Sequence, residues 1–162
     1  MNLEETIIQE LLDKSYTLTT AESCTGGLLA GRILNVSGAS AVYNEGHITY
    51  SNDAKERLLG VEHSTLQQYG AVSKETAAEM AKGAALAANA NVALCTTGIA
   101  GPTGGTPEKP VGLVYVGCYY NGEVIVEEHY FTGDREQNRN NAVEAALQLL
   151  WRKLLTEEKV HF

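Results

Sequence analysis

The chain has 162 residues, of which 44% are hydrophobic and 20% are charged, and its net charge at pH 7 is −8. This length and composition are typical of one globular domain, so we expect a single domain over residues 1–162. The acidic balance excludes nucleic acid as the main partner, because contacts with a phosphate backbone need a basic surface. The first residues do not resemble a signal peptide, and no apolar stretch is long enough to span a bilayer. We therefore expect a cytoplasmic protein with no membrane partner.

Neither the cysteines nor the histidines are spaced like metal ligands. The cysteines form no C-x-x-C pair and the histidines form no H-E-x-x-H arrangement; these residues are Cys24, Cys95, Cys118, His47, His63, His129 and His161. An odd number of cysteines fits reduced thiols in a reducing compartment. We expect no metal site and no cofactor.

Helical and strand-like patterns alternate in the first half of the chain. Short runs of β-branched and aromatic residues predict strands over residues 16–20 and 41–50. Apolar residues at helical spacing, together with capping residues, predict helices over residues 3–12, 25–35, 53–59, 64–69 and 73–89.

The second half of the chain is richer in strands. Residues 92–97 are mostly apolar, which predicts a central strand buried on both faces. A loop dense in glycine and proline follows over residues 98–110, and an Asn-Gly pair, a strong hairpin signal, joins strands over residues 111–120 and 123–131. A last helix runs from about residue 134 to about residue 155. This order predicts an α/β fold, a three-layer α/β/α sandwich whose mixed sheet contains a C-terminal β-hairpin.

The most informative segment is TAESCTGG, over residues 20–27. It lies between a predicted strand and a predicted helix, which puts the Ser23 hydroxyl on a strand-to-helix turn. Backbone N–H groups at a helix N-terminus have no intrahelical partner, and they favour a bound anion or a reacting oxyanion. A structural role also fits, because serine and threonine are favoured helix caps and glycines allow close packing.

A second segment, YSNDAK over residues 50–55, puts Lys55 in the first turn of a predicted helix. The helix dipole disfavours a cation at this end, and a positive neighbourhood or burial lowers the pKa of a lysine. A lysine with a lowered pKa can act as a general base toward a serine hydroxyl. The ordinary alternative is a surface lysine paired with Glu56 or Glu62.

Two further segments fit ligand binding. The glycine-rich loop follows the predicted central strand, and ligands of α/β sheets bind outside the carboxyl ends of the strands. It matches neither a Walker A loop nor a dinucleotide fingerprint, and a long turn shaped by glycine and proline is the alternative. Arg135 and Arg139 share a face at the start of the last helix, where they fit an anion such as phosphate or else pair with nearby acids.

Together these segments resemble one family. Six collinear stretches are similar to the CinA C-terminal domain family: residues 21–27, 49–55, 70–73, 97–102, 109–112 and 133–135. The resemblance extends from about Thr17 to Leu154, which is nearly the whole chain. Enzymatically assigned members of this family are nicotinamide-nucleotide amidases. The resemblance therefore implies hydrolysis of nicotinamide mononucleotide to nicotinate mononucleotide and ammonia, a step that recycles pyridine nucleotides.

The resemblance also implies roles for individual residues. Ser23 stands where the family has its nucleophile and Lys55 where it has its base, whereas Tyr50, Thr97 and Arg139 stand where it has further active-site residues. In the implied mechanism, neutral Lys55 accepts the proton of Ser23 as the serine attacks the amide carbon. The proton then passes to the leaving ammonia through the Tyr50 hydroxyl, and water cleaves the acyl-enzyme.

Substrate binding is implied at two places. The N–H groups of Thr25 and Gly26 stabilise the oxyanion, and Arg139 together with the loop that begins at Gly98 holds the nucleotide through its phosphate. Asn138 precedes Arg139 where the family has a small or apolar residue, so the sequence leaves open whether Arg135 or Arg139 meets the phosphate. The family also implies a homodimer, and the start of this chain at the amidase domain resembles the family's stand-alone form.

Three alternatives remain open in the sequence. Cys24 is a rival nucleophile, because a helix N-terminus would lower the pKa of its thiol. A non-catalytic nucleotide-binding or regulatory module would use the same loop and arginines, with Ser23 only capping its helix. For an amidase, the substrate preference among mononucleotide, riboside and free nicotinamide is also open.

Overall fold

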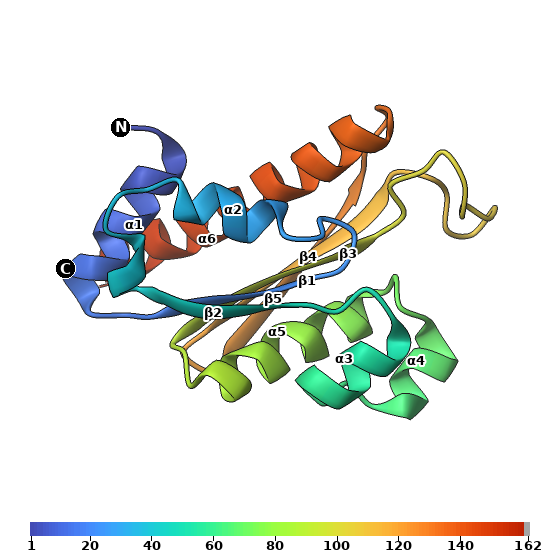
Figure 1. The fold of residues 1–162 in the computed structure, drawn as a ribbon, viewed down its shortest axis with the longest axis horizontal. Helices are drawn as coiled ribbons and strands as arrows, with labels where there is room; N and C mark the ends of the chain where they lie inside the picture. Colours follow the sequence, from blue (N-terminus) through green and yellow to red (C-terminus); the bar gives the residue numbers. More distant parts are fainter. Residues whose placement is uncertain (161–162) are drawn as a thin grey trace.

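A computed structural model describes residues 1–160 of the chain as helices on both faces of one sheet (Figure 1). The elements, in chain order, are α1 (Leu3–Lys14), β1 (Leu18–Glu22), α2 (Leu28–Leu34), the short 3-10 helix η1 (Ala39–Ala41), β2 (Tyr43–Ile48), α3 (Asn52–Leu59), α4 (His63–Tyr69), α5 (Lys74–Ala88), β3 (Val92–Gly98), β4 (Leu113–Tyr120), β5 (Glu123–Tyr130) and α6 (Arg135–Val160). Within these 160 residues, no helix combines the length and the apolar character needed to cross a membrane.

The sheet is mixed, as the sequence predicts. Its strand order is β2-β1-β3-β4-β5. Strand β1 pairs in parallel with both β2 and β3, whereas β4 runs antiparallel to β3 and to β5. β4 and β5 are consecutive and are joined at Asn121-Gly122, where both residues have positive φ. The predicted α/β fold with a mixed sheet is thus confirmed.

Two apolar cores lie on opposite faces of the sheet. Helices α1, α2 and α6 cover one face, and α3, α4 and α5 cover the other (Figure 1). Strand β3 shows why both cores form: Val92 and Leu94 pack in the first core, while Ala93 and Cys95 pack in the second. Successive side chains of a strand point to opposite faces, so an uninterrupted apolar strand belongs between two helical layers.

Some element boundaries differ from the predicted ones because of backbone geometry. Helix α2 begins at Leu28 rather than at residue 25, since Gly26 and Gly27 have φ of +55° and +107°. These are left-handed conformations, which a right-handed helix cannot include. Strand β4 begins at Leu113 rather than at residue 111, after Gly112 with φ of +94°. The residues before both elements are therefore turns.

The topology gathers chemistry-bearing residues at one edge of the sheet. The parallel strands β2, β1 and β3 all point the same way, so their carboxyl ends lie together. Ser23 follows β1, Tyr50 follows β2 and Thr97 lies near the end of β3. Strand β5, antiparallel to β4, ends at this edge too, and the short link after it delivers the start of α6 with Arg135.

Candidate active site

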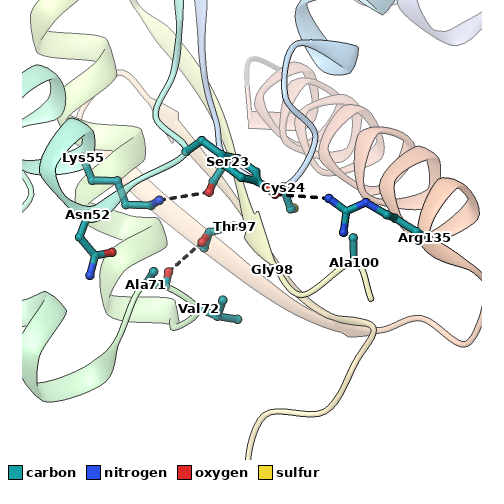
Figure 2. A pocket seen from close by; sticks show the side chains of 11 residues that line it. Ser23, Cys24, Asn52, Lys55, Ala71, Val72, Thr97, Gly98, Ala100 and Arg135 are labelled. Carbon is teal, nitrogen blue, oxygen red and sulfur yellow. Dashed lines mark hydrogen bonds between the residues drawn. The ribbon is translucent and has the colours of Figure 1, made fainter. Parts of the chain in front are cut away.

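A cavity of about 180 Å³ lies at this edge of the sheet (Figure 2). Its walls come from five parts of the chain: the turn after β1, the link from β2 into the first turn of α3, the segment before α5, the end of β3 with the start of the loop after it, and the start of α6. The residues in it that carry chemistry are Ser23, Cys24, Tyr50, Lys55, Thr97 and Arg135. The same cavity is therefore lined by residues from three segments that the sequence singled out separately, namely residues 20–27, residues 50–55 and the start of the glycine-rich loop. Arg135, one of the two arginines, lines it as well.

Ser23 and Lys55 form a hydrogen-bonded pair in this cavity. The Lys55 Nζ atom lies 3.1 Å from Ser23 Oγ (Figure 2). It donates a second hydrogen bond, of 2.8 Å, to the backbone oxygen of Thr49. The whole Lys55 residue is only 1% exposed. Ser51 caps α3 by accepting from the Ala54 N–H, so the start of the helix is fixed one turn before the lysine.

Burial without a counter-ion changes the chemistry of this lysine. Desolvation is the main cause that lowers the pKa of Lys55 below its ordinary value. Among the described residues no carboxylate forms an ion pair with it; Glu56 instead contacts His63. The surface-lysine alternative is therefore wrong. A larger share of neutral amine at moderate pH is what a general base next to a serine hydroxyl requires.

The turn that carries Ser23 is held by a buried carboxylate. Glu22 is fully buried and accepts hydrogen bonds from the N–H groups of Leu29 (2.8 Å) and Ala30 (3.0 Å) and from Thr25 Oγ1 (2.6 Å). A remote carboxylate thus caps α2, since Gly27 offers no side chain. Glu22 has no role that its sequence motif reveals by itself, although an acid at the end of a strand just before a helix is a usable signal.

Thr25 and Gly26 lie in the same turn but do not line the cavity. The Thr25 hydroxyl is fully buried between Glu22 and Thr96, at 2.6 and 2.7 Å. The Gly26 N–H donates to the backbone oxygen of Ser23, at 3.2 Å. Gly26 thus already uses the N–H that was expected to serve the oxyanion, whereas no bond from the Thr25 N–H to another described residue is found.

Thr97 and Gly98 do line the cavity, at the end of β3. The Thr97 hydroxyl donates a 2.7 Å hydrogen bond to the backbone oxygen of Ala71, which fixes the segment before α5 as the opposite wall (Figure 2). Thr97 is 1% exposed, so its side chain supports the wall. Gly98 packs closely against β4, because a Cβ there would lie 2.6 Å from a methyl group of Val114.

The two arginines of α6 occupy different places. Arg135 lines the cavity and donates to the backbone oxygen of Gly101 (2.8 Å) and to the Tyr50 hydroxyl (3.3 Å). Arg139, one turn later, donates to the backbone oxygens of Cys24 (2.9 Å) and Thr25 (3.1 Å) and does not line the cavity. Neither guanidinium forms an ion pair with a carboxylate of the described residues.

The rival nucleophile is electronically unsuited to the role. Burial raises the pKa of the Cys24 thiol to about 11, and it outweighs the lowering effects of a hydrogen bond to Thr96 and of the Arg139 charge. The thiolate is the reactive form of cysteine, so this thiol is inactive near neutral pH. The helix N-terminus that was expected to lower the pKa begins only at Leu28.

Residues 1–160 contain no cluster of three or more histidine, cysteine, aspartate or glutamate side chains that could hold a metal ion. His47, His63 and His129 lie within this part of the chain, and His161 lies outside the described residues.

Comparison with known proteins places the chain in a family. A family model described as the CinA C-terminal domain matches residues 1–154, so the chain belongs to this family. It is 54% identical to a CinA-like protein of Kosmotoga olearia over 154 residues, which cover 95% of this chain but 37% of that protein. The chain spans well under half the length of the curated relatives that it matches first, 37% or 38% of two Clostridium proteins.

Solved structures agree with the fold over almost the whole chain. The competence/damage inducible protein CihA of Agrobacterium tumefaciens superimposes with a TM-score of 0.90 at 45% identity, covering 93% of this chain and 92% of that one. A CinA superfamily protein of Klebsiella pneumoniae gives a TM-score of 0.91 at 36% identity, with coverages of 95% and 96%. The arrangement of helices around the mixed sheet is therefore that of the CinA superfamily.

Proposed function

We propose that the chain is an amidohydrolase that removes the amide nitrogen of nicotinamide mononucleotide and releases nicotinate mononucleotide and ammonia, as a step in pyridine nucleotide recycling. The observation that carries the proposal is the 3.1 Å contact between the buried Lys55 amine and the Ser23 hydroxyl. A binding module needs a cation but gains nothing from burying that cation without a counter-ion beside a serine. A Ser/Lys nucleophilic pair needs this arrangement.

The proposed reaction has two chemical steps. Neutral Lys55 takes the proton of Ser23 while the serine oxygen forms a bond to the amide carbon. The turn after β1 supplies N–H donors for the resulting oxyanion, because neither the Cys24 N–H nor the Thr25 N–H has an acceptor among the described residues. The amide nitrogen of the tetrahedral intermediate then receives a proton from the Lys55 ammonium through the Tyr50 hydroxyl and departs as ammonia. Water, deprotonated by the same amine, finally cleaves the ester and restores Ser23.

The direct test is ammonia release by the purified chain. We expect turnover of nicotinamide mononucleotide, measured beside nicotinamide riboside and free nicotinamide to establish the preference. The Ser23→Ala variant should retain the thermal unfolding midpoint of the wild type and lose at least about 1000-fold in kcat. If Ser23→Ala released ammonia near the wild-type rate, the nucleophile would be assigned wrongly. The Cys24→Ser variant is the matched control, and it should keep its activity.

The other candidate function is a non-catalytic nucleotide-binding or regulatory module. Tight binding of nicotinamide mononucleotide without ammonia release at any pH would support it. The observation against it is again Lys55, because an exposed cation binds an anion at lower cost than a buried one. The homodimer that the family resemblance implies stays a prediction, which light scattering of the purified chain would test.

A further inference from the structure

Arg139 is bound to the backbone of the nucleophile turn, here defined as residues 22–27. Its Nε and Nη2 atoms donate to two successive carbonyl oxygens, those of Cys24 and Thr25, at 2.9 and 3.1 Å. Arginine presents its donors in a rigid planar fork, so two such bonds fix the orientation of both carbonyls. The guanidinium is thereby engaged with the protein itself at the place where the family resemblance suggested a substrate phosphate.

The orientation of a carbonyl determines the orientation of the next N–H. A trans peptide is planar and its C=O and N–H bonds point in opposite directions. When the Cys24 oxygen points toward Arg139, the Thr25 N–H must point away from Arg139. The Thr25 N–H lies two residues after Ser23 in the chain, and it has no acceptor among the described residues. Arg139 therefore determines the direction in which the Thr25 N–H is aimed.

The rest of the turn is shaped around the guanidinium. Gly26 has φ of +55°, and a Cβ added there would lie 3.2 Å from Arg139 Nη2. On the opposite side, the Thr25 hydroxyl is fixed by Glu22 and Thr96. The turn is thus held from both sides, by a buried acid through a side chain and by a half-buried arginine through the backbone.

Arg135 offers what Arg139 lacks. It is exposed, it lines the cavity and one of its two contacts is a long bond of 3.3 Å to the Tyr50 hydroxyl. The cavity volume of about 180 Å³ is below the roughly 300–1,000 Å³ that is usual for sites of small molecules. A mononucleotide with its carboxamide at Ser23 must therefore extend past the cavity mouth, where the Arg135 guanidinium lies.

We infer that the two arginines, one helical turn apart, divide the work. Arg139 is a positioning residue that aims the Thr25 N–H at the oxyanion through the Cys24–Thr25 peptide, and Arg135 is the residue that recognises the phosphate. This inference rests on the proposed amidase function. Arg139 should therefore affect the rate of the chemical step, whereas Arg135 should affect how well the site distinguishes the nucleotide from the riboside.

Steady-state kinetics of two matched variants test this division, with nicotinamide mononucleotide and nicotinamide riboside as substrates. Arg139→Gln should lower kcat about 100-fold for both substrates, as the loss of an oxyanion donor does, with little change in KM. Arg135→Gln should raise KM for the nucleotide about tenfold or more and leave the riboside constants nearly unchanged. Arg152→Gln, on the same helix but paired with Glu127 of β5, is the control and should behave as wild type.

The opposite pattern would overturn the inference: a KM effect confined to the nucleotide in Arg139→Gln, with kcat retained. A second measurement does not depend on turnover. In amide proton–nitrogen NMR spectra, Arg139→Gln should shift the Thr25 and Gly26 resonances, whereas Arg135→Gln should leave them in place. Unchanged Thr25 and Gly26 resonances in Arg139→Gln would refute the positioning role. A wild type that releases no ammonia would refute the proposed function, and the spectra would still decide whether Arg139 holds the turn.

Discussion

The nucleophile turn and the glycine-rich loop over residues 98–112 begin from neighbouring parallel strands at the same sheet edge, yet they are built in opposite ways. In the nucleophile turn, residues 22–25 are buried and are linked by hydrogen bonds to β3, α2 and α6. In the loop, residues 102–108 are all exposed, and the segment extends away from the sheet (Figure 1). The loop is anchored mainly at its base, where Arg135 and Asn138 bind the oxygens of Gly101 and Ala100.

The difference shows where precise geometry is needed. The proposed nucleophile and its proposed base must keep hydrogen-bond distance, and the segment carrying Ser23 is held by buried polar contacts that are costly to break. A segment that only contacts the outer part of a ligand can remain exposed and tolerate change. We therefore expect substitutions in the two segments to differ in effect by orders of magnitude.

The largest effect is expected at the base that faces the nucleophile turn. Lys55→Met should lower kcat by at least about 1000-fold, because the serine proton then has no acceptor. Lys55→Arg should be equally inactive, since a guanidinium stays protonated. In the wild type, kcat/KM should rise with pH through the lowered pKa of Lys55 as the amine becomes neutral. A rate that falls over this pH range would contradict the role of Lys55 as a base.

The same lysine should make stability depend on pH. Its pKa is lowered in the folded chain but stays near 10.4 in the unfolded one, so between these values the unfolded state binds more protons. The free energy of unfolding should therefore rise with pH in that window, by up to about 1.4 kcal/mol per pH unit, and be lowest below it. Urea unfolding of wild type and Lys55→Met measures this, because the variant should lack the dependence. Parallel curves for the two proteins would show that folding does not lower the pKa of Lys55.

A smaller effect is expected at Glu22, which ties the nucleophile turn to α2. Glu22→Gln keeps the shape but replaces one acceptor oxygen by a donor facing N–H and hydroxyl groups. The free energy of unfolding should fall by about 1–3 kcal/mol, and kcat should fall with it as the turn loosens. Glu108→Gln, the same change in the exposed loop, is the matched control. Equal unfolding midpoints for Glu22→Gln and Glu108→Gln would show that the nucleophile turn is no more sensitive to this change than the exposed loop.

The smallest effect is expected at the loop tip. Lys109 donates to the backbone oxygen of Tyr69 at 2.5 Å, the contact that links the tip of the loop to α4. Because this amine is near solvent, Lys109→Ala should change the free energy of unfolding by no more than about 0.5 kcal/mol. kcat should be unchanged, since the loop does not touch the dyad. A loss of kcat comparable to that of Glu22→Gln would show that the loop helps to position the reacting groups.

Much of the fold could be read from the sequence because its signals are local. The apolar run before Thr97 predicted a doubly covered strand, and the Asn121-Gly122 pair predicted a tight connection, since both depend on neighbouring residues only. The start of α2 was missed because Gly26 and Gly27 have a left-handed backbone and lie against residues from outside the segment, Arg139 and Ile48. Local propensity cannot register such contacts.

The candidate site divides in the same way. The sequence singled out Ser23 and Lys55, but their 3.1 Å contact joins residues 32 positions apart. It also singled out Arg135 and Arg139 as a pair on one helix face, and it could not tell which of them faces the cavity. That depends on how α6 packs against the turn after β1 and the base of the loop. Glu22 was overlooked because its three partners become visible only when α2 is placed over the end of β1.

The sequence by itself determined the alternation of helices and strands, the family to which the chain belongs and the residues able to react, because these follow from composition, periodicity and motif order. Only the tertiary structure decided that Lys55 is buried beside Ser23, that burial raises the pKa of the Cys24 thiol and that the two arginines bind different groups. The physical reason is desolvation and long-range hydrogen bonding. Both depend on which atoms surround a group in space, and those atoms come from distant segments of the chain.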